Sequence, residues 1–189
     1  MPAVDAQRWD VRHRANLDQP VGAPRAFLLE SARFLPASGW ALDVAMGRGA
    51  AAGYLLQRGL NVIGVDISPV AVRAARAEWP GLLAVRADLT AFELQSESLD
   101  VIVNFYYLER SLWPAFGRML KPGGLLIFET MTVAMSGRPV DADPAHLLAP
   151  QELLSYFRSW DVLDYRESAS APEGRSRRPT AAIAARRPR

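Results

Sequence analysis

The stretch that decides the fold runs from Ala41 to Ser68 and reads ALDVAMGRGAAAGYLLQRGLNVIGVDIS. It begins with a short apolar run and continues through glycines at positions 47 and 49 into a segment of small residues. It ends in a second apolar run that closes on Asp66. Two such apolar runs are typical of strands buried on both faces of a sheet. The stretch therefore predicts a strand, a glycine loop, a helix and a second, parallel strand.

Apolar runs and amphipathic segments continue on both sides of this stretch. Further helices are expected at 5–15, 23–36, 69–79, 112–120 and 150–160. Further strands are expected at 81–89, 99–108, 125–130, 161–167 and 180–187. Ser68 and Pro69 predict the start of the helix at 69–79, since serine caps helices and proline suits their first position. The residues KPGG at 121–124 are expected to turn the chain into the strand that follows.

Strands that alternate with helices predict an α/β fold with a doubly wound, mostly parallel sheet of seven strands. We expect one Rossmann-like domain over residues 1–189. The last two strands are joined by a polar connection that contains proline and glycine, so an antiparallel hairpin is expected at the C-terminal end. Within that hairpin, TAAIAA at 180–185 is expected to be a short edge strand that flanking arginines keep soluble.

Composition excludes several classes of site. The chain has no cysteine, which excludes a disulfide framework, a thiolate metal site and a cysteine nucleophile. His13 and His146 are the two histidines, too few for a multi-histidine metal site, so we expect no metal. No apolar run is long enough to cross a bilayer, and the first residues lack the apolar core of a signal peptide. A cytoplasmic location and no membrane partner are therefore expected.

The charge of the chain is modest, with a net value of +2 and a sequence pI near 9.3. Lys121 is the single lysine, so arginine supplies nearly all of the basic charge. Arginines gather at the C-terminus in RSRRPTAAIAARRPR, which admits two interpretations. A basic tail can bind nucleic acid or another polyanion. The alternative, the edge strand described above, is favoured, so we do not expect a nucleic-acid partner.

The glycine loop and Asp66 together indicate a site for an adenosine cofactor. In a doubly wound sheet, ligands bind at the carboxyl ends of the strands. Gly47 and Gly49 carry no side chain, which lets the backbone approach a ligand closely. Asp66 ends the second strand, where its carboxylate can accept hydrogen bonds from ribose hydroxyls. A nicotinamide cofactor fits this pattern too, because residues 47–52 satisfy G-x-G-x-x-A.

Three features favour a cofactor with positive charge over a dinucleotide. Asp43 lies in the first strand just ahead of the glycines, where a carboxylate would repel a pyrophosphate but attract an ammonium or sulfonium group. Asp88 ends the strand at 81–89 in the sequence RADL, where it can accept a hydrogen bond from an adenine amino group. A dehydrogenase also needs a substrate domain, for which this chain has no room.

Six segments carry a resemblance to a known family. They are WDVRH at 9–13, ALDVAMGRG at 41–49, VIGVDIS at 62–68, RADL at 86–89, LKPGGLLIFET at 120–130 and HLLAPQELLSYF at 146–157. Over nearly its whole length the chain resembles a class I S-adenosylmethionine-dependent methyltransferase. Within that class it is similar to the small bacterial tellurite-resistance and thiopurine methyltransferases. The resemblance implies S-adenosylmethionine as the cofactor and residues 1–22 as a lid.

The resemblance also implies a role for each position that matches the family pattern. Asp43 would orient the methionine end of the cofactor, and Asp66 would hold the ribose. The adenine would lie against Ile67, Asp88 and Leu89. The remaining implied cofactor contacts are Trp9 in the lid, Ala45, Gly47 and Gly49 in the loop, and Asn104 and Phe105 beside the sulfonium. Ala45 departs from the pattern, since relatives often have glycine there.

Structural interpretations stand beside these roles. Asp43 is also explained as a buried carboxylate that binds loop amides, and Asp88 as a turn cap. Trp9 is also explained as an anchor that pins its helix to the core.

The sequence does not identify the methyl acceptor. Methyl transfer from a sulfonium needs an oriented nucleophile more than a strong base, so no catalytic signature is required. The fourth strand ends in NFYYLER and lacks the Asn/Asp-Pro-Pro-aromatic motif of enzymes that methylate amines of bases or glutamine amides. A small-molecule acceptor is therefore expected, and the resemblance favours a thiol or a chalcogen oxyanion. Candidates to line its pocket are Tyr106, Tyr107, Arg110, Glu129, Arg138 and His146.

Three other functions stay open. The chain can be a cofactor-binding partner or sensor without turnover, or an RNA or protein methyltransferase that docks through its basic tail. A nicotinamide oxidoreductase is the last alternative. The sequence predicts no oligomeric state.

Overall fold

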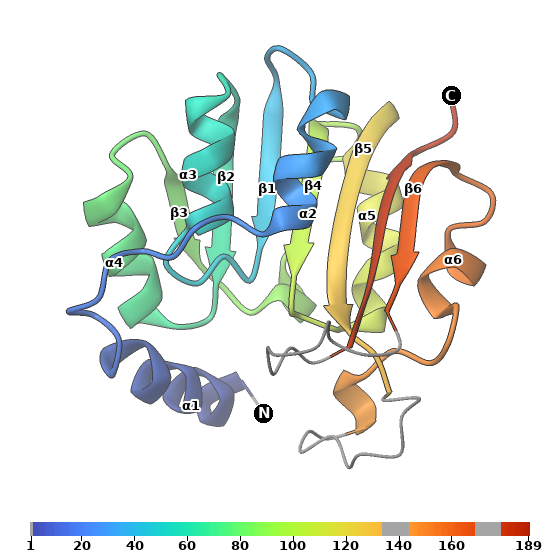
Figure 1. The fold of residues 1–189 in the computed structure, drawn as a ribbon. Coiled ribbons are helices and arrows are strands. Elements are labelled where there is room, and N and C mark those ends of the chain that lie inside the picture. The colour runs from blue at the N-terminus through green and yellow to red at the C-terminus, as the bar shows by residue number, and fades with distance from the viewer. Residues whose placement is uncertain (1, 134–143, 169–178) are drawn as a thin grey trace.

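The structure is a computed structural model that describes residues 2–133, 144–168 and 179–189. A seven-stranded sheet forms its centre, in the order β3-β2-β1-β4-β5-β7-β6, with helices on both faces (Figure 1). The strands are β1 (Trp40–Val44), β2 (Asn61–Asp66), β3 (Leu83–Arg86), β4 (Leu99–Phe105), β5 (Leu120–Met131), β6 (Asp161–Glu167) and β7 (Thr180–Arg186). The helices are α1 (Pro2–Arg14), α2 (Ala26–Glu30), α3 (Ala50–Gln57), α4 (Pro69–Glu78), α5 (Trp113–Met119) and α6 (Glu152–Tyr156). Short 3-10 turns lie at Ser31–Phe34, Leu89–Ala91, Arg110–Leu112 and Pro144–His146.

The direction of the strands confirms the predicted fold class. Strands β1 to β5 pair in parallel, while β7 runs antiparallel to both β5 and β6. The chain order reverses between β1 and β4, which are neighbours although two strands separate them in the sequence. This reversal is the topological switch point, where the carboxyl ends of the strands leave a crevice for ligands.

The predicted hairpin is present, but the edge strand was assigned wrongly. β7, which contains TAAIAA, lies between β5 and β6, and the polar strand β6 forms the edge. The physical reason is burial, because the five residues from 181 to 185 are buried, and only an inner strand buries both of its faces. The side chains of β6 are exposed or half-buried, as suits an edge.

Two apolar layers cover the sheet. On one face, Leu42 and Val44 of β1 pack with Phe116 of α5 and Phe157 after α6. On the other face, Ala41 packs with the helices α2, α3 and α4. The alternation of side chains along β1 sends neighbouring residues to opposite layers, so Asp43 points to the face that carries α3.

Several elements differ from their expected form, among them β3, which is limited to Leu83–Arg86 of the strand expected at 81–89. The helix expected at 23–36 is shorter, because α2 ends at Glu30 and the chain continues as a 3-10 turn. The helix expected at 150–160 is limited to Glu152–Tyr156. The residues 121–124 lie inside β5 rather than before it, because Gly123 adopts φ +78° and the pairing with β4 shifts there, which places a bulge within the strand.

Two arginines of the described tail bind the protein's own backbone. Arg186 donates to the carbonyls of Gly123 and Phe34, each at 3.0 Å. Arg187 donates to the carbonyl of Leu120 and forms an ion pair with Glu97 at 3.0 Å. These two side chains therefore fasten β7 to its surroundings. Arg175, Arg177 and Arg178 lie outside the described residues.

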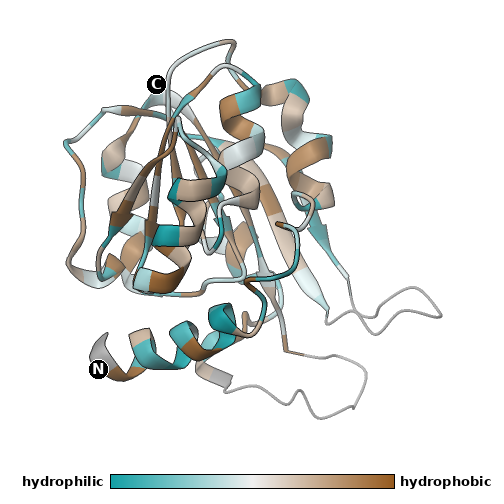
Figure 2. Ribbon diagram, turned by 90° about the vertical axis from the view of Figure 1, so that its left-hand side faces the viewer, coloured by the Kyte–Doolittle hydropathy of each residue, from teal (hydrophilic) through white to brown (hydrophobic). Residues whose placement is uncertain are grey.

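The helix α1 is the one element that lies apart from the layers of the fold. It crosses below the carboxyl ends of the strands and contacts α4 (Figure 1). Figure 2 shows it as a largely hydrophilic helix beneath the body of the molecule. Within the described part of the chain, no helix combines the length and the apolar character needed to cross a membrane.

Candidate functional site

Asp66 joins the end of β2 to the glycine loop that follows β1. One carboxylate oxygen, Oδ2, accepts a hydrogen bond from the N–H of Gly47 at 2.8 Å. The other, Oδ1, accepts one from the N–H of Ser68, also at 2.8 Å. A carboxylate has about four lone-pair positions, so each oxygen can still accept a hydrogen bond from a hydroxyl. The structure thus brings together two of the residues that the sequence assigned to the cofactor.

Burial raises the pKa of Asp66, whose residue is 6% exposed. The N–H groups of Ser68 and Gly47 and the nearby His13 act in the opposite direction, because they favour the charged form. The carboxylate is therefore desolvated but supported by donors, as expected of a group held ready to bind hydroxyls.

The two glycines of the loop serve different purposes. Gly47 has φ +55°, and a side chain there would face the imidazole of His13 at 3.4 Å, across the crevice. Gly49 has φ +79°, but a side chain there would meet the indole of Trp79 at 3.0 Å. Gly49 therefore makes room for Trp79, which donates to the carbonyl of Arg48 at 3.2 Å. The sequence contained no signal for this contact, since Trp79 follows α4.

Ala45 adopts a backbone conformation that favours glycine. Its φ is +52°, in the left-handed region that costs a residue with a Cβ roughly 1–2 kcal/mol. The alanine that departs from the family pattern is therefore a strained residue at the start of the loop. The loop keeps the conformation because Asp66 and Trp79 hold it further along.

Asp43 is buried beneath the loop, with 3% of the residue exposed. Its Oδ2 accepts a hydrogen bond from the N–H of Ala52 in α3 at 2.9 Å. Burial raises the pKa of Asp43 to about 7, the Ala52 N–H lowers it, and the charge of Asp66 raises it further. The N–H of Ala52 is thus the loop amide that the structural interpretation of Asp43 expected. Asp43 also lies at the switch point, so its role in binding the cofactor stays a prediction.

The residues expected at adenine lie around the ends of β2 and β3. Asp88 follows β3 and accepts hydrogen bonds from the N–H of Thr90 at 3.0 Å and its hydroxyl at 2.8 Å. It is therefore a turn cap, as the structural interpretation expected. Leu89 is buried and Ile67 is half-buried. Their contact with adenine stays a prediction.

Asn104 ends β4 beside Val44 and is 1% exposed. Its side-chain oxygen, Oδ1, finds no hydrogen-bond partner among the described residues. A buried acceptor without a partner is uncommon and calls for an explanation. A ligand group that donates hydrogen bonds at the switch point would satisfy it. Phe105 is half-buried next to it.

The helix α1 closes over this region. Asp10 accepts hydrogen bonds from the hydroxyl of Ser68 at 2.5 Å and from the N–H of Val70 at 3.3 Å. His13 reaches the glycine loop, as described above. Trp9 is half-buried, and the guanidinium groups of Arg8 and Arg12 lie over its ring at 5.7 and 5.1 Å. Sequence analysis missed Asp10, because nothing in its spacing indicates a partner 58 residues away.

Two tyrosines among the acceptor candidates follow β4. Tyr106 has φ +59°, and the guanidinium of Arg25 lies 4.1 Å from the centre of its ring. Burial raises the pKa of Tyr107 to about 12, aided by the carboxylates of Glu109 and Asp88. The phenol of Tyr107 therefore stays protonated at neutral pH and does not act as a base there.

Arg110 is engaged with its own chain rather than free for an acceptor. It donates to the carboxylate of Glu152 at 2.5 and 2.9 Å and to the carbonyls of Ala145 and Leu147 at 3.0 and 2.9 Å. We therefore assign it to holding the segment before α6. His146 is exposed in that segment. Glu129 is half-buried near the end of β5. Arg138 falls outside the described residues.

Comparison with known proteins decides the family. Residues 42–128, from β1 to β5, match the family described as a methyltransferase domain. This match, with the relatives described below, supports a class I S-adenosylmethionine-dependent methyltransferase. The predictions of that family and of S-adenosylmethionine as its cofactor are thereby confirmed.

One curated relative is a probable S-adenosylmethionine-dependent methyltransferase of Mycolicibacterium smegmatis. It is 30% identical over 113 residues, which are 56% of this chain and 44% of the relative. The methyltransferase domain therefore spans less than half the length of that relative.

Solved structures of several proteins share the fold. TehB from Haemophilus influenzae superposes with a TM-score of 0.76 at 19% identity, over 91% of this chain and 65% of that one. The geranyl diphosphate C-methyltransferase of Streptomyces coelicolor, in complex with S-adenosyl-L-homocysteine, superposes with a TM-score of 0.72 at 16% identity. The match covers 98% of this chain and 97% of that one. The [4+2]-cyclase SpnF superposes with a TM-score of 0.74 at 17% identity, over 97% of this chain and 95% of that one.

Asp43→Asn tests the cost of the buried carboxylate. A carboxyl with a raised pKa contributes stability that is complete below its unfolded value of about 4 and is lost as pH rises through 7. We expect the variant to gain stability relative to wild type across this window, by up to about 4 kcal/mol above pH 7. Urea unfolding at pH 4, 6 and 8 measures it, with the ion-paired Asp100→Asn as control. A difference that does not change with pH would contradict the prediction.

Ala45→Gly tests the strain in the loop. Removing the Cβ relieves the left-handed conformation but adds entropy to the unfolded chain, so the free energy of unfolding should rise by about 0.5–1 kcal/mol. The matched control is Ala77→Gly at an exposed position of α4, which should lower it by up to about 1 kcal/mol. Urea unfolding of both variants decides, and a loss of stability at position 45 would show that the loop is not strained.

Proposed function

We propose that this chain transfers the methyl group of S-adenosylmethionine to a small-molecule acceptor. The observation that carries the proposal is the Asp66 carboxylate, held by the N–H groups of Gly47 and Ser68 where the loops after β1 and β2 meet. In this family the corresponding acid binds a ribose. The geometry supports the same role here, because Gly47, whose N–H binds Oδ2, has no side chain to block the approach of a ligand to the carboxylate.

The residues around Asp66 suit the rest of the cofactor. Asp43 provides a buried negative charge for the ammonium of the methionine end. Asn104 provides an acceptor that has no partner among the described residues. Ile67 and Leu89 provide apolar contacts for adenine.

The chemistry asks little of the protein beyond position. S-adenosylmethionine supplies an electrophilic methyl group on a sulfonium. The residues of this chain have to hold the acceptor in line with that group and keep water away, and such orientation can supply up to roughly 7–11 kcal/mol. Tyr106 and Tyr107, which follow β4, are placed to border the acceptor. Tyr107 contributes shape and a hydrogen-bond donor rather than a base, because its pKa is raised to about 12.

Several observations support a small acceptor with a soft nucleophile, such as a thiol or a chalcogen oxyanion. The chain lacks the motif of enzymes that methylate amines of bases, and Arg186 and Arg187 are bound to their own backbone rather than presented to a polyanion. The resemblance to tellurite-resistance and thiopurine methyltransferases points in the same direction. An RNA or protein acceptor that docks through the tail therefore has less support.

The alternative is a protein that binds the cofactor without methyl transfer. It deserves a test because the solved structures with this fold include a [4+2]-cyclase. Binding and turnover must therefore be measured separately.

Asp66→Asn tests the cofactor site. The change keeps the shape of the side chain but replaces one acceptor oxygen with a donor, so binding of S-adenosylhomocysteine should weaken at least ten-fold, about 1.4 kcal/mol. Asp100→Asn is the matched control, since Asp100 also accepts a backbone N–H, from Trp40 at 2.8 Å, but at the opposite end of the sheet. Calorimetric titration measures both. If wild type bound a nicotinamide dinucleotide and not S-adenosylhomocysteine, the proposal would fail.

Turnover is measured as release of S-adenosylhomocysteine from S-adenosylmethionine in the presence of aromatic thiols, selenite and tellurite. We expect release with at least one of these acceptors and its loss in Asp66→Asn. Tight binding without release with any acceptor, including phenols and amines, would favour the non-catalytic alternative.

A further inference from the structure

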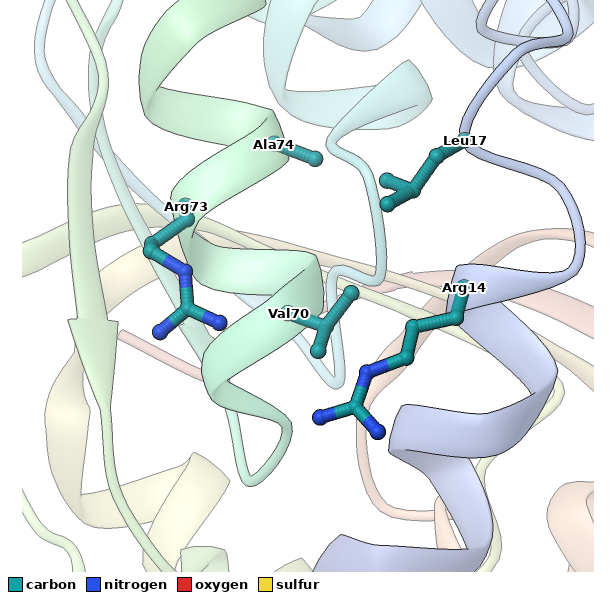
Figure 3. A pocket seen from close by; sticks show the side chains of 5 residues that line it. All are labelled: Arg14, Leu17, Val70, Arg73 and Ala74. Carbon is teal, nitrogen blue, oxygen red and sulfur yellow. The ribbon is translucent and has the colours of Figure 1, made fainter.

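A pocket of about 430 Å³ opens on the outer surface where the end of α1 meets α4. Arg14, Leu17, Val70, Arg73 and Ala74 line it (Figure 3). The first two belong to the end of α1 and the turn after it, and the other three lie in the first turns of α4. None of these residues was assigned to the cofactor or the acceptor.

The pocket combines an apolar floor with two cationic side chains. Val70 lies between Arg14 and Arg73 in Figure 3, and Leu17 and Ala74 line the other end. Val70 is buried, whereas Leu17 is 42% exposed and offers apolar surface to a ligand. The surface is therefore apolar where a hydrocarbon body would lie and cationic at its margin.

The charge of the two arginines is only partly compensated. Among the described residues, Arg14 has one ion pair, a long one of 3.8 Å with Asp10. In the part of the chain that the structure describes, Arg73 makes neither a hydrogen bond nor an ion pair, and its charge acts on Asp10 from a distance. Asp10 is a carboxylate on which the charges of both arginines act. Its Oδ1 is already occupied by Ser68 and Val70, so the three charged groups together leave a net charge of +1.

The helix end itself does not provide the site. The N–H of Val70 is taken by Asp10, and the N–H of Ala71 by the hydroxyl of Ser68 at 3.2 Å. An anion here would therefore be bound by the guanidinium groups, which pair with carboxylate or phosphate oxygens through two parallel hydrogen bonds.

We propose that this pocket binds an amphipathic oxyanion, a small molecule with an apolar body and one phosphate, sulfate or carboxylate group. Its body covers Leu17, Val70 and Ala74, and its oxyanion lies between Arg14 and Arg73. The site differs from the Asp66 crevice in its lining, since none of its five lining residues donates a hydrogen bond to Asp66. A ligand that touches both helices also strengthens the contact between them.

The test uses 1-naphthyl phosphate, which carries both features. Two matched probes each lack one of them, since 1-naphthol has no oxyanion and inorganic phosphate has no apolar body. Binding to the full chain is followed by amide and arginine side-chain NMR shifts and by calorimetry. We expect 1-naphthyl phosphate to bind at least ten-fold more tightly than either probe, with shifts confined to residues 14–17 and 70–74. Saturation with S-adenosylhomocysteine should not displace it.

Two variants and one control complete the experiment. Arg14→Gln and Arg73→Gln combined should weaken binding at least ten-fold, and Ala74→Leu should do the same by filling the pocket while leaving both charges. Arg58→Gln, at an exposed arginine after α3, should have no effect. All substituted positions are exposed or half-buried, and an unchanged melting temperature checks folding. Displacement by S-adenosylhomocysteine, or binding that survives the double variant, would overturn the proposal.

Discussion

The hydrogen bonds that Asp66 accepts are the constraint on which the rest of the site depends. One oxygen binds the loop after β1, at Gly47, and the other binds the start of α4, at Ser68. Because β1 and β2 are neighbouring parallel strands, this single side chain sets the spacing of the two loops that leave their carboxyl ends. The strained backbone of Ala45 lies between β1 and Gly47, whose N–H is held by Asp66, so the surrounding contacts keep it in place.

Ser68 extends this constraint to α1. Its N–H donates to Asp66, its hydroxyl donates to Asp10 on α1, and the same oxygen caps α4 by accepting from Ala71. The position of α1 therefore depends on the residue next to the one that fixes the glycine loop. This arrangement couples the covering helix to the site beneath it, because movement of α1 breaks a hydrogen bond to the cap of α4. The pocket lined by Arg14, Leu17, Val70, Arg73 and Ala74 lies along the same contact between α1 and α4.

The sequence was sufficient for features that local patterns determine and insufficient for those that depend on distant partners. The first strands, the glycine loop and the Ser68 cap follow from apolar runs, small residues and helix-start chemistry. The place of β7 inside the sheet depends on which strand pairs with β5, which an alanine-rich segment does not reveal. Gly49 was assigned to a ligand because the indole of Trp79 that fills its space arrives from the end of another helix. Arg110 was assigned to an acceptor because its partner, Glu152, lies 42 residues away.

The burial of two acids supports the proposal that the site binds a positively charged ligand. Asp43 and Asp66 both lose solvation, which raises the pKa of each, and the charge of Asp66 raises that of Asp43 further. Backbone N–H groups offset only part of this cost, because a carboxylate that leaves water loses several hydrogen bonds and gains one or two here. A ligand with phosphate groups would add to the repulsion. A ligand with an ammonium and a sulfonium would reduce this repulsion. The electrostatic cost of burying two acids in the free protein would therefore favour a positively charged cofactor over an anionic one.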